Sequence, residues 1–258
     1  MENSLLFDIV ICVGPNDITI IEKTLPFTKQ NIIGYRNIYL VSYDSKLVLP
    51  GTITIDENIY PFTKQNLIEK FGDNSRNGWY LQQLLKMYAG NVIPGILKRY
   101  LVIDSDTYFL KPTNFITNDG KHYLDRGYEY HDPYFKHMNK LHPALYKHPE
   151  LNGISGISHH MFFNNDSLNK LFKMVETYHS NGKLFWELML DTIDKNHYMG
   201  SGYSEYEIYF NYMFLYHKND IIIRNLKWQN LSCLDPHNTN DNDFVSIHWY
   251  IRKSNTYI

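Results

Sequence analysis

Cysteine is scarce in this chain, and so are the features of secreted and membrane-spanning proteins. Two cysteines, Cys12 and Cys233, stand among 258 residues, too few for the disulfide framework of a small secreted domain. We therefore expect two reduced thiols in a cytoplasmic protein. No apolar run approaches the roughly 20 residues of a membrane-spanning helix, so we expect no membrane span. The N-terminus lacks the basic segment that opens a signal peptide.

An excess of charge of either sign is also lacking. Lysine and arginine number 25, aspartate and glutamate number 27, and the formal net charge is -2. Such a chain offers no broad electrostatic attraction to nucleic acid or to an anionic membrane surface, so we expect neither as a partner. Phosphate-binding glycine loops are missing too, because neither G-x-G-x-x-G after the first strand nor G-x-x-x-x-G-K-[ST] occurs. A dinucleotide-dependent redox enzyme and a P-loop nucleotidase are therefore disfavoured.

Aromatic residues, in contrast, are abundant. The chain has 22 tyrosines and 14 phenylalanines. Tyrosine offers a flat apolar face with a polar tip, which suits contacts to sugars or nucleobases. A general bias of the chain toward Tyr, Ile, Asn and Lys explains the same counts, and the composition leaves both explanations open.

The stretch 100–110 (YLVIDSDTYFL) is the most informative part of the sequence. Its short run Leu101 to Ile103 predicts a strand that is covered on both faces. Asp104 and Asp106 then follow at the carboxyl end of that strand, where open α/β sheets bind their ligands. Two carboxylates at this spacing suit a divalent cation, which in turn grips phosphate oxygens.

Strand and helix patterns alternate along the rest of the chain. Strands are expected at 6–13, 38–42, 53–56, 157–163, 221–224 and 244–249, and helices at 18–29, 62–71, 78–90, 168–178, 184–193 and 204–216. Residues 111–152 show neither pattern and are expected to form a long functional loop. The strands and helices before Asp104 indicate a Rossmann-like half, and no linker divides the chain.

A Rossmann-like half that ends in a strand with Asp-x-Asp resembles the GT-A class of nucleotide-sugar glycosyltransferases. Further likenesses are the helix 76–86 before the motif, the acidic helix start at 204–207, and the late segment 245–249 with His248. The resemblance is to small GT-A domains of large DNA viruses and bacteria, and it spans residues 7–249. It implies one α/β domain of GT-A fold over residues 1–258 with a mixed central sheet. Residues 1–110 would bind the nucleotide sugar, and residues 111–258 would form the acceptor side.

The resemblance also implies a reaction. A hexosyl or deoxyhexosyl group would pass from a nucleoside diphosphate sugar, with a UDP-sugar favoured, to a hydroxyl of a glycan or protein acceptor. Mn²⁺ or Mg²⁺, held by Asp104, Asp106 and His248, would neutralise the leaving diphosphate. The imidazole of His248 suits Mn²⁺ better than Mg²⁺ because it is the softer ligand.

Other candidates for the site come from residue types and positions. Glu205 and Glu207 are candidates for the general base, although the dipole of a helix start also favours acids there. His159 and His160 face opposite sides of their expected strand, and we take His160 as the catalytic candidate. The candidates for donor binding, some of which a solvated helix face or a packed core explains equally well, are Val13, Asp17, Arg76, Trp79, Gln83, Lys86 and Ser105.

Two other functions remain open. Asp104-Ser-Asp106-Thr107 also matches the first motif of haloacid-dehalogenase-like phosphatases, in which Asp104 would be the nucleophile and Asp106 the acid or base. That class usually has its motif near the N-terminus and needs a later strand ending in an acidic pair, which this chain lacks. The other alternative is a sugar-binding module without catalysis, which would be favoured by a solvent-facing Glu205 far from the two aspartates.

Overall fold

The computed structural model describes residues 5–233, 241–248 and 251. Strands and helices alternate along them. They are β1 (Phe7–Val13), α1 (Ile18–Asn31), β2 (Ile32–Ile33), β3 (Tyr35–Ser42), β4 (Ile53–Asp56), α2 (Lys64–Phe71), α3 (Asn77–Val92), β5 (Arg99–Ile103), β6 (Thr107–Phe109), β7 (Thr113–Asn114), β8 (His122–Asp125), α4 (Asp132–Leu141), β9 (His160–Asn164), α5 (Asn165–His179), α6 (Phe185–Asp191), α7 (Glu205–Tyr216), β10 (Ile221–Arg224), β11 (Trp228–Asn230) and β12 (Phe244–Ser246).

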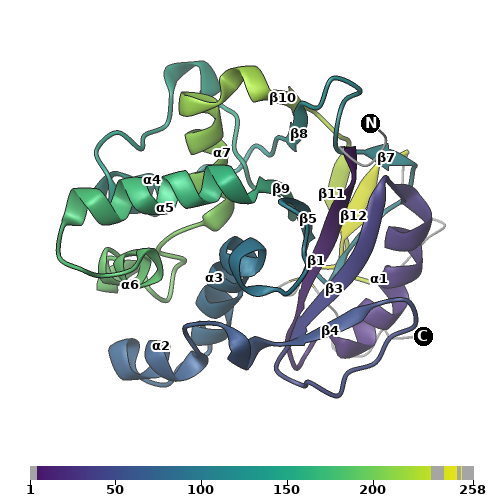
Figure 1. The fold of residues 1–258 in the computed structure, drawn as a ribbon, viewed down its shortest axis with the longest axis horizontal. Coiled ribbons are helices and arrows are strands. Elements are labelled where there is room, and N and C mark those ends of the chain that lie inside the picture. Colours follow the sequence, from purple (N-terminus) through teal and green to yellow (C-terminus); the bar gives the residue numbers. More distant parts are fainter. Residues whose placement is uncertain (1–4, 234–240, 249–250, 252–258) are drawn as a thin grey trace.

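A central sheet of five strands in the order β4-β3-β1-β5-β9 organises the protein. The first four of these are parallel to their neighbours, and β9 runs antiparallel to β5. The fold is therefore mixed α/β, as the sequence predicts. Residues 100–103 of β5 are completely buried, which confirms that this strand is covered on both faces. In Figure 1, α1 lies to the right of β1 and β3, and α3 lies to their left.

One buried carboxylate joins three segments beneath this sheet. Asp8 interrupts the apolar pattern of β1 and is 0% exposed. It accepts two hydrogen bonds from the Arg36 guanidinium, at 3.0 and 2.7 Å, and further ones from the backbone N–H groups of Asn37 and Leu97. Because its oxygens are fully engaged, Asp8 ties β1 to β3 and to the turn before β5 at little desolvation cost.

A smaller sheet brings the late part of the chain to the Asp-x-Asp motif. Strand β12 lies antiparallel to β6, with Ser246 opposite Thr107, and parallel to β11. Because β6 begins directly after Asp106, this pairing places residues 244–248 beside the end of β5. Two further pairs, β10 with β8 and β2 with β7, complete the strands of the described residues.

The expected long loop at 111–152 is wrong. The segment contains β7, β8 and α4. Helix α4 begins with a proline in its first turn and buries only His137, Met138 and Leu141. Such a short, polar helix has too few apolar positions for its period to stand out in the sequence.

The expected helix end at Gly90 is also wrong, because α3 continues to Val92. Gly90 is required by packing. A Cβ at this position would lie 2.5 Å from Asn165 Oδ1 and 2.9 Å from Tyr100 Cε1. The glycine therefore lets α3 approach β5 and the start of α5 closely. The other expected helices and strands are present, with ends that shift by a few residues. Trp249, the last residue of the strand expected at 244–249, lies outside the described residues.

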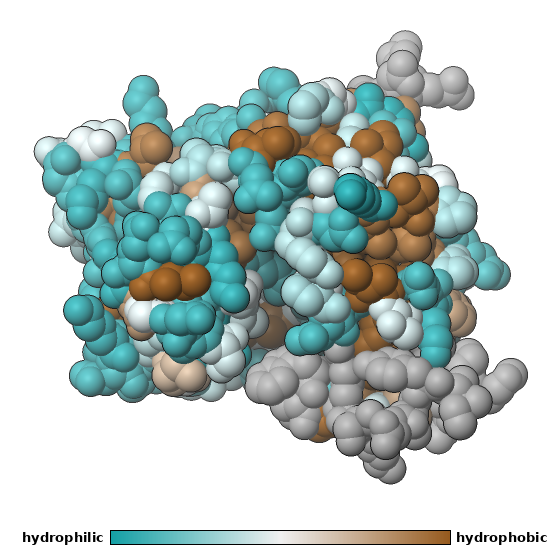
Figure 2. All heavy atoms as spheres, turned by 90° about the horizontal axis from the view of Figure 1, so that it is seen from below, coloured by the Kyte–Doolittle hydropathy of each residue, from teal (hydrophilic) through white to brown (hydrophobic). Residues whose placement is uncertain are grey.

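The structure also bears on the expected reduced cysteines and on the expected absence of a membrane span. Cys12 and Cys233 are both free thiols. Among the helices of residues 5–233 and 241–248, none is long and apolar enough to cross a bilayer. Figure 2 shows one face of the molecule as a mosaic of hydrophilic and hydrophobic residues, with the hydrophobic ones more frequent on the side that carries the sheet.

Candidate functional site

The candidate site lies where the parallel strands of the central sheet end. Strand β1 ends at Val13 and β5 at Ile103, and these two strands run parallel as direct neighbours. Asp104 and Asp106 follow in the turn after β5. The turn is fixed from two sides, because Thr107 N donates to Asp104 O at 2.9 Å and Thr24 Oγ1 donates to Ser105 O at 2.8 Å. Ser105 itself is 4% exposed.

Asp104 is the centre of a cluster of polar side chains. Its Oδ1 accepts from Lys86 Nζ at 2.6 Å and from the Tyr206 hydroxyl at 3.1 Å. Lys86 comes from α3 and Tyr206 from α7, so three elements far apart in the sequence meet at one oxygen. The ammonium also lies 4.4 Å from the centroid of the Tyr206 ring, a cation–π contact that adds to its stability.

Glu205 belongs to the same cluster. It is 3% exposed, and its Oε1 accepts from Lys86 Nζ at 2.8 Å. Its backbone N–H donates to Oε1 of the buried Gln83 at 3.0 Å, which fixes the start of α7 against α3. Glu205 is thus neither solvent-facing nor far from the aspartates, which removes the condition that would favour a non-catalytic module.

The buried charges set the protonation states of the cluster. Burial opposes ionisation of Asp104, but the Lys86 ammonium and His159 outweigh it and hold the pKa of Asp104 well below its usual range. Burial also opposes the charge on Lys86, and the two carboxylates raise its pKa well above its usual range. Burial raises the pKa of Glu205, which Lys86 offsets only in part. Asp104 is therefore an ionised carboxylate at neutral pH.

His159 approaches Asp104 from the opposite side. Its Nδ1 lies 3.5 Å from Asp104 Oδ2, and its backbone carbonyl accepts from Asp104 N at 2.9 Å. The residue has a φ of 60°, a left-handed conformation that costs a non-glycine residue about 1 kcal/mol or more. Its ring packs edge-on against Trp228, and its Nε2 is buried without a hydrogen-bond partner among the described residues. Backbone strain beside a reactive carboxylate is a frequent mark of a functional residue.

The neighbouring His160 lies elsewhere. Its Nε2 is 2.8 Å from Asp125 Oδ2, and the Arg224 guanidinium donates to both oxygens of the same carboxylate at 2.6 and 2.8 Å. His160 and Asp125 are 1% and 3% exposed. The described contacts thus join His160 to β8 and β10, whereas His159 joins the Asp104 cluster. The residue that faces the cluster is therefore His159, and it lies just before β9 in a left-handed conformation, so the expected strand alternation does not apply to this pair.

Asp106 and His248 reach the same region through β12. The Ser246 hydroxyl donates to Asp106 Oδ1 at 3.2 Å, and Ile247 N donates to Asp106 O at 2.9 Å. The ring of His248 lies 5.3 Å from that of His159, centroid to centroid. Within the described ranges, however, no three Asp, Glu, His or Cys side chains converge closely enough to hold a metal ion by themselves.

The other residues predicted for the site make their described contacts outside the Asp104 cluster. At the start of α3, Arg76 donates to the Ser201 hydroxyl, and its guanidinium stacks 4.1 Å from the centroid of the Trp79 ring. Asp17 is the N-cap residue of α1 in the turn after β1. Glu207 is 1% exposed, its carboxylate accepts from Asn211 Nδ2 at 2.9 Å, and burial raises its pKa to about 7. None of the hydrogen bonds described for these residues reaches Asp104.

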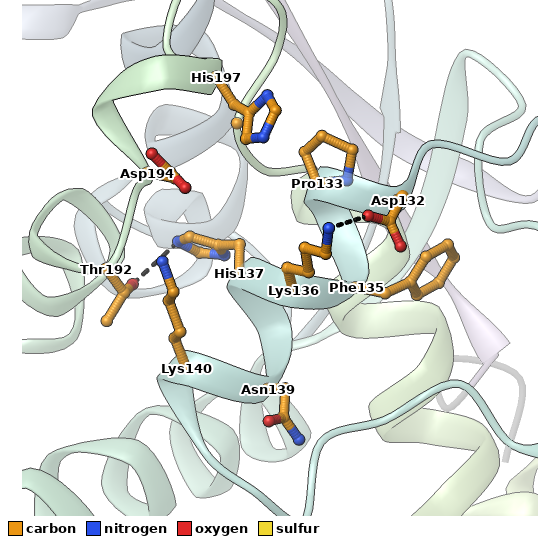
Figure 3. A pocket seen from close by; sticks show the side chains of 11 residues that line it. Asp132, Pro133, Phe135, Lys136, His137, Asn139, Lys140, Thr192, Asp194 and His197 are labelled. Carbon is orange, nitrogen blue, oxygen red and sulfur yellow. Dashed lines mark hydrogen bonds and ion pairs between the residues drawn. The ribbon is translucent and has the colours of Figure 1, made fainter.

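A cavity of about 540 Å³ lies between α4 and residues 192–202 (Figure 3). Lys136, His137 and Lys140 extend from α4 along one wall, and Thr192, Asp194 and His197 lie opposite them. None of the residues lining it belongs to the Asp104 cluster. It comes nearest in sequence at Gly202, which also lines it and lies three residues before Glu205.

Several residues of the site escape sequence reasoning. Tyr206 and Ser246 are ordinary members of an aromatic helix and a short apolar strand, and only the fold shows that both contact an aspartate. Trp228 lies in β11, which the sequence does not predict. For His159 the signal is present, since it is one of two adjacent histidines, but periodicity alone does not say which one faces the ligand edge.

Comparisons with known proteins identify a family and a similar solved structure. A search of curated proteins finds no match. Among solved structures, the chain is similar to the apo crystal structure of mouse xyloside xylosyltransferase 1. The TM-score is 0.47, the sequence identity is 10%, and the match covers 96% of this chain and 99% of that chain. A model of a family of unknown function, DUF6492, matches residues 50–246, a range that includes Lys86, Asp104 and Glu205. The chain therefore belongs to the DUF6492 family.

Proposed function

We propose that this protein is a GT-A-type glycosyltransferase that moves a sugar from a nucleoside diphosphate sugar, with a UDP-sugar favoured, to a hydroxyl of a glycan or protein acceptor. One observation carries the proposal. The Asp-x-Asp motif lies at the carboxyl end of the central buried strand, Lys86 and His159 contact its first carboxylate, and Glu205 binds the same Lys86 ammonium. A charged cluster at this edge of a mixed α/β sheet is where such folds bind phosphate-bearing ligands.

The residues fit a divalent cation that is shared with the substrate. Mg²⁺ and similar ions are often held by one or two carboxylates together with substrate phosphates, and not by a cage made only of protein. Asp104 and Asp106 would supply those carboxylates, and His248, at the end of β12, would favour Mn²⁺. The ion would neutralise charge on the leaving diphosphate.

Lys86 and Glu205 would act as a unit beside that diphosphate. The ammonium is held between two carboxylates at 2.6 and 2.8 Å, so its position is fixed before substrate arrives. A fixed cation costs no reorganisation when negative charge develops on the leaving group. Because Glu205 is buried and bound to Lys86, its contacts support a role in positioning Lys86 more than the role of general base.

The general base, which takes the proton from the hydroxyl of the sugar acceptor, would then be a group other than Glu205. His159 has an unpartnered Nε2 within the described residues and an acidic neighbour at Nδ1. A carboxylate at one ring nitrogen favours the tautomer in which the other nitrogen accepts a proton. Glu207 has a pKa of about 7, which suits a base, but it belongs to another set of contacts. We therefore propose His159 ahead of Glu205, Glu207 and His160.

Turnover of a panel of nucleoside diphosphate sugars tests the proposal. We expect metal-dependent release of free sugar from one of them in the absence of acceptor, and its loss in excess chelator. Asp106→Asn, which keeps an oxygen that can accept from the Ser246 hydroxyl, should abolish this turnover in a protein that still folds, as its unfolding curve would check. The matched control is Asp56→Asn, which changes a carboxylate at the end of the outer strand β4 and should keep full activity.

The alternatives give different results in the same assay. A haloacid-dehalogenase-like phosphatase would prefer small phosphomonoesters to nucleotide sugars. A binding module would bind one nucleotide sugar and turn over none. Full turnover by Asp106→Asn, or turnover that chelator leaves unchanged, would refute the metal-dependent mechanism.

A further inference from the structure

A second polar cavity lies at the opposite end of strand β5. It has a volume of about 380 Å³ and is lined by residues that include Arg99, His122, Asn164 and Ser167. Arg99 begins β5 and Asp104 follows its end, and five residues of extended chain separate the two by roughly 17 Å. The cavity is therefore distinct from the Asp104 cluster.

Arg99 is a partly buried guanidinium that lacks a counter-charge. Within the described part of the chain, its side chain makes no hydrogen bond or ion pair, although its backbone pairs with Asn164 in the sheet. Burial alone lowers the pKa of Arg99, without any compensating carboxylate. The guanidinium is therefore available to pair with an anion that enters the cavity.

His122 is the second group without a partner. It is 6% exposed and makes no side-chain hydrogen bond with the described residues, and its Nδ1 is fully buried. Burial and, next, the charge of Arg99 lower the pKa of His122 to about 4. Arg99 and His122 thus share one cavity, neither side chain has a hydrogen-bond partner among the described residues, and a bound anion would favour the protonated form of His122.

The other walls supply hydrogen-bond donors. Ser167 lies in the first turn of the 15-residue helix α5, and its hydroxyl makes no hydrogen bond with the described residues. Three other charged residues line the cavity, Asp119, Lys121 and Asp220, and each has a solvent-accessible side chain with a partner of its own. Asp119 accepts from Thr117 Oγ1, and Asp220 lies 3.2 Å from His217 Nδ1, with side-chain exposures of 66% and 65%. The unpaired charge of the cavity is therefore that of Arg99.

We infer that this cavity is an oxyanion site, in which Arg99, His122 and Ser167 bind a phosphate-sized anion away from the donor site. Arg99 would bind two oxygens of the anion with its planar fork, His122 would donate from one ring nitrogen, and Ser167 from its hydroxyl. The chemistry is that of inorganic phosphate or of the phosphoryl group of a larger ligand, for which the cavity has additional room. The inference does not depend on glycosyl transfer.

Phosphate binding followed at His122 tests this site. In protein with labelled histidines, we expect the His122 ring signals to shift in a saturable way with inorganic phosphate, and the pKa of His122 to rise. Arg99→Gln should weaken phosphate binding by about tenfold or more, the loss of a charge-assisted pair of hydrogen bonds. The matched control, Lys98→Gln, removes an exposed charge that is paired with Asp166 and should bind phosphate as the original protein does.

Two further arms identify the ligand and exclude the donor site. Tighter binding of glycerol 3-phosphate than of inorganic phosphate would support a phosphoryl group on a larger ligand, and equal binding would support free phosphate. Asp106→Asn, a change at the donor site, should leave the His122 response to phosphate unchanged. The inference is overturned if phosphate at tens of millimolar leaves His122 unshifted, if Arg99→Gln binds as tightly as the original protein, or if Asp106→Asn abolishes the response. Nucleotide-sugar turnover by Arg99→Gln should be normal, so this test and that of the transferase can fail separately.

Discussion

Lys86→Met is the substitution that most directly tests the buried cluster. Lys86 is 3% exposed, and its ammonium bonds to Asp104 at 2.6 Å and to Glu205 at 2.8 Å. Methionine keeps most of the aliphatic stem but leaves two carboxylates facing each other without a cation. Removal of one partner from a buried ion pair typically costs about 3–5 kcal/mol. The Asp104 side chain keeps 21% of its exposure to solvent, so we expect a loss near the lower end, about 3 kcal/mol.

Urea unfolding measures this loss of stability. A second substitution shows how much of the loss comes from the unpaired charge of Glu205. Glu205→Gln in the Lys86→Met background removes one of the unpaired charges and should recover about 1–2 kcal/mol. The control is Lys98→Met, whose partner Asp166 is exposed, so that its cost should stay within about 1 kcal/mol. The reasoning is refuted if Lys86→Met costs no more than the control, or if Glu205→Gln recovers nothing.

The pH dependence of the stability of Lys86→Met is an independent test, because its direction can be predicted. In Lys86→Met the buried Glu205 has lost its cation, so its folded pKa rises further above its unfolded value. The folded state then binds more protons than the unfolded state between these two pKa values, and the free energy of unfolding rises as pH falls through that window. The deficit of Lys86→Met should therefore shrink on acidification. In the original protein the low pKa of Asp104 acts in the opposite direction, because that stability is present above the unfolded pKa and is lost as pH falls toward the folded one.

Three further substitutions test other parts of the structure. Gly90→Ala should cost about 1–3 kcal/mol in urea unfolding, because its Cβ would lie 2.5 Å from Asn165 Oδ1, whereas Gly78→Ala, where a Cβ meets nothing within 4 Å, should be neutral or stabilising. Asp8→Ala should cost about 3 kcal/mol or more by removing the ion pair of Arg36 and leaving two backbone N–H groups unpaired, and a cost as small as that of Asp44→Ala, which removes a single local hydrogen bond to Lys46 N, would contradict this. Glu207→Gln should abolish a decline in stability between pH 4.5 and about 7, since the raised folded pKa of Glu207 makes its ionisation unfavourable in the folded state; an unchanged pH profile would contradict the burial of that carboxylate.

The sequence predicts the elements of this fold well where their periodicity is strong. The β5 strand, the α3 helix and the Ser204 cap of α7 are all present, and Ser204 Oγ accepts from Glu207 N at 3.3 Å. The return half of the expected capping box is absent from the described contacts of Glu207, whose carboxylate accepts from Asn211. The local sequence pattern identifies Ser204 as the cap, but tertiary contacts determine which hydrogen bonds the buried Glu207 carboxylate makes.

Which residues meet in the site depends on contacts between segments far apart in the sequence, and local sequence patterns do not reveal these contacts. Lys86 and Glu205 are expected separately, as a donor contact and as a base, and the fold makes them partners because α3 and α7 cross beside β5. Likewise, Ser246 meets Asp106 only because β12 returns to pair with β6. Pairings across more than half of the chain follow from the topology of the sheets, and the sequence alone gives little information about them.

The measurement that tests the central proposal most directly is the affinity for UDP with and without Mn²⁺, by calorimetry on the original protein and on Asp106→Asn. If Asp104 and Asp106 hold an ion that binds the diphosphate, Mn²⁺ should tighten UDP binding by about tenfold or more in the original protein. It should have little effect in Asp106→Asn, while Asp56→Asn should respond as the original protein does. Equal UDP affinity in Mn²⁺ and in excess chelator, or an undiminished effect of Mn²⁺ in Asp106→Asn, would contradict a metal site at the end of β5.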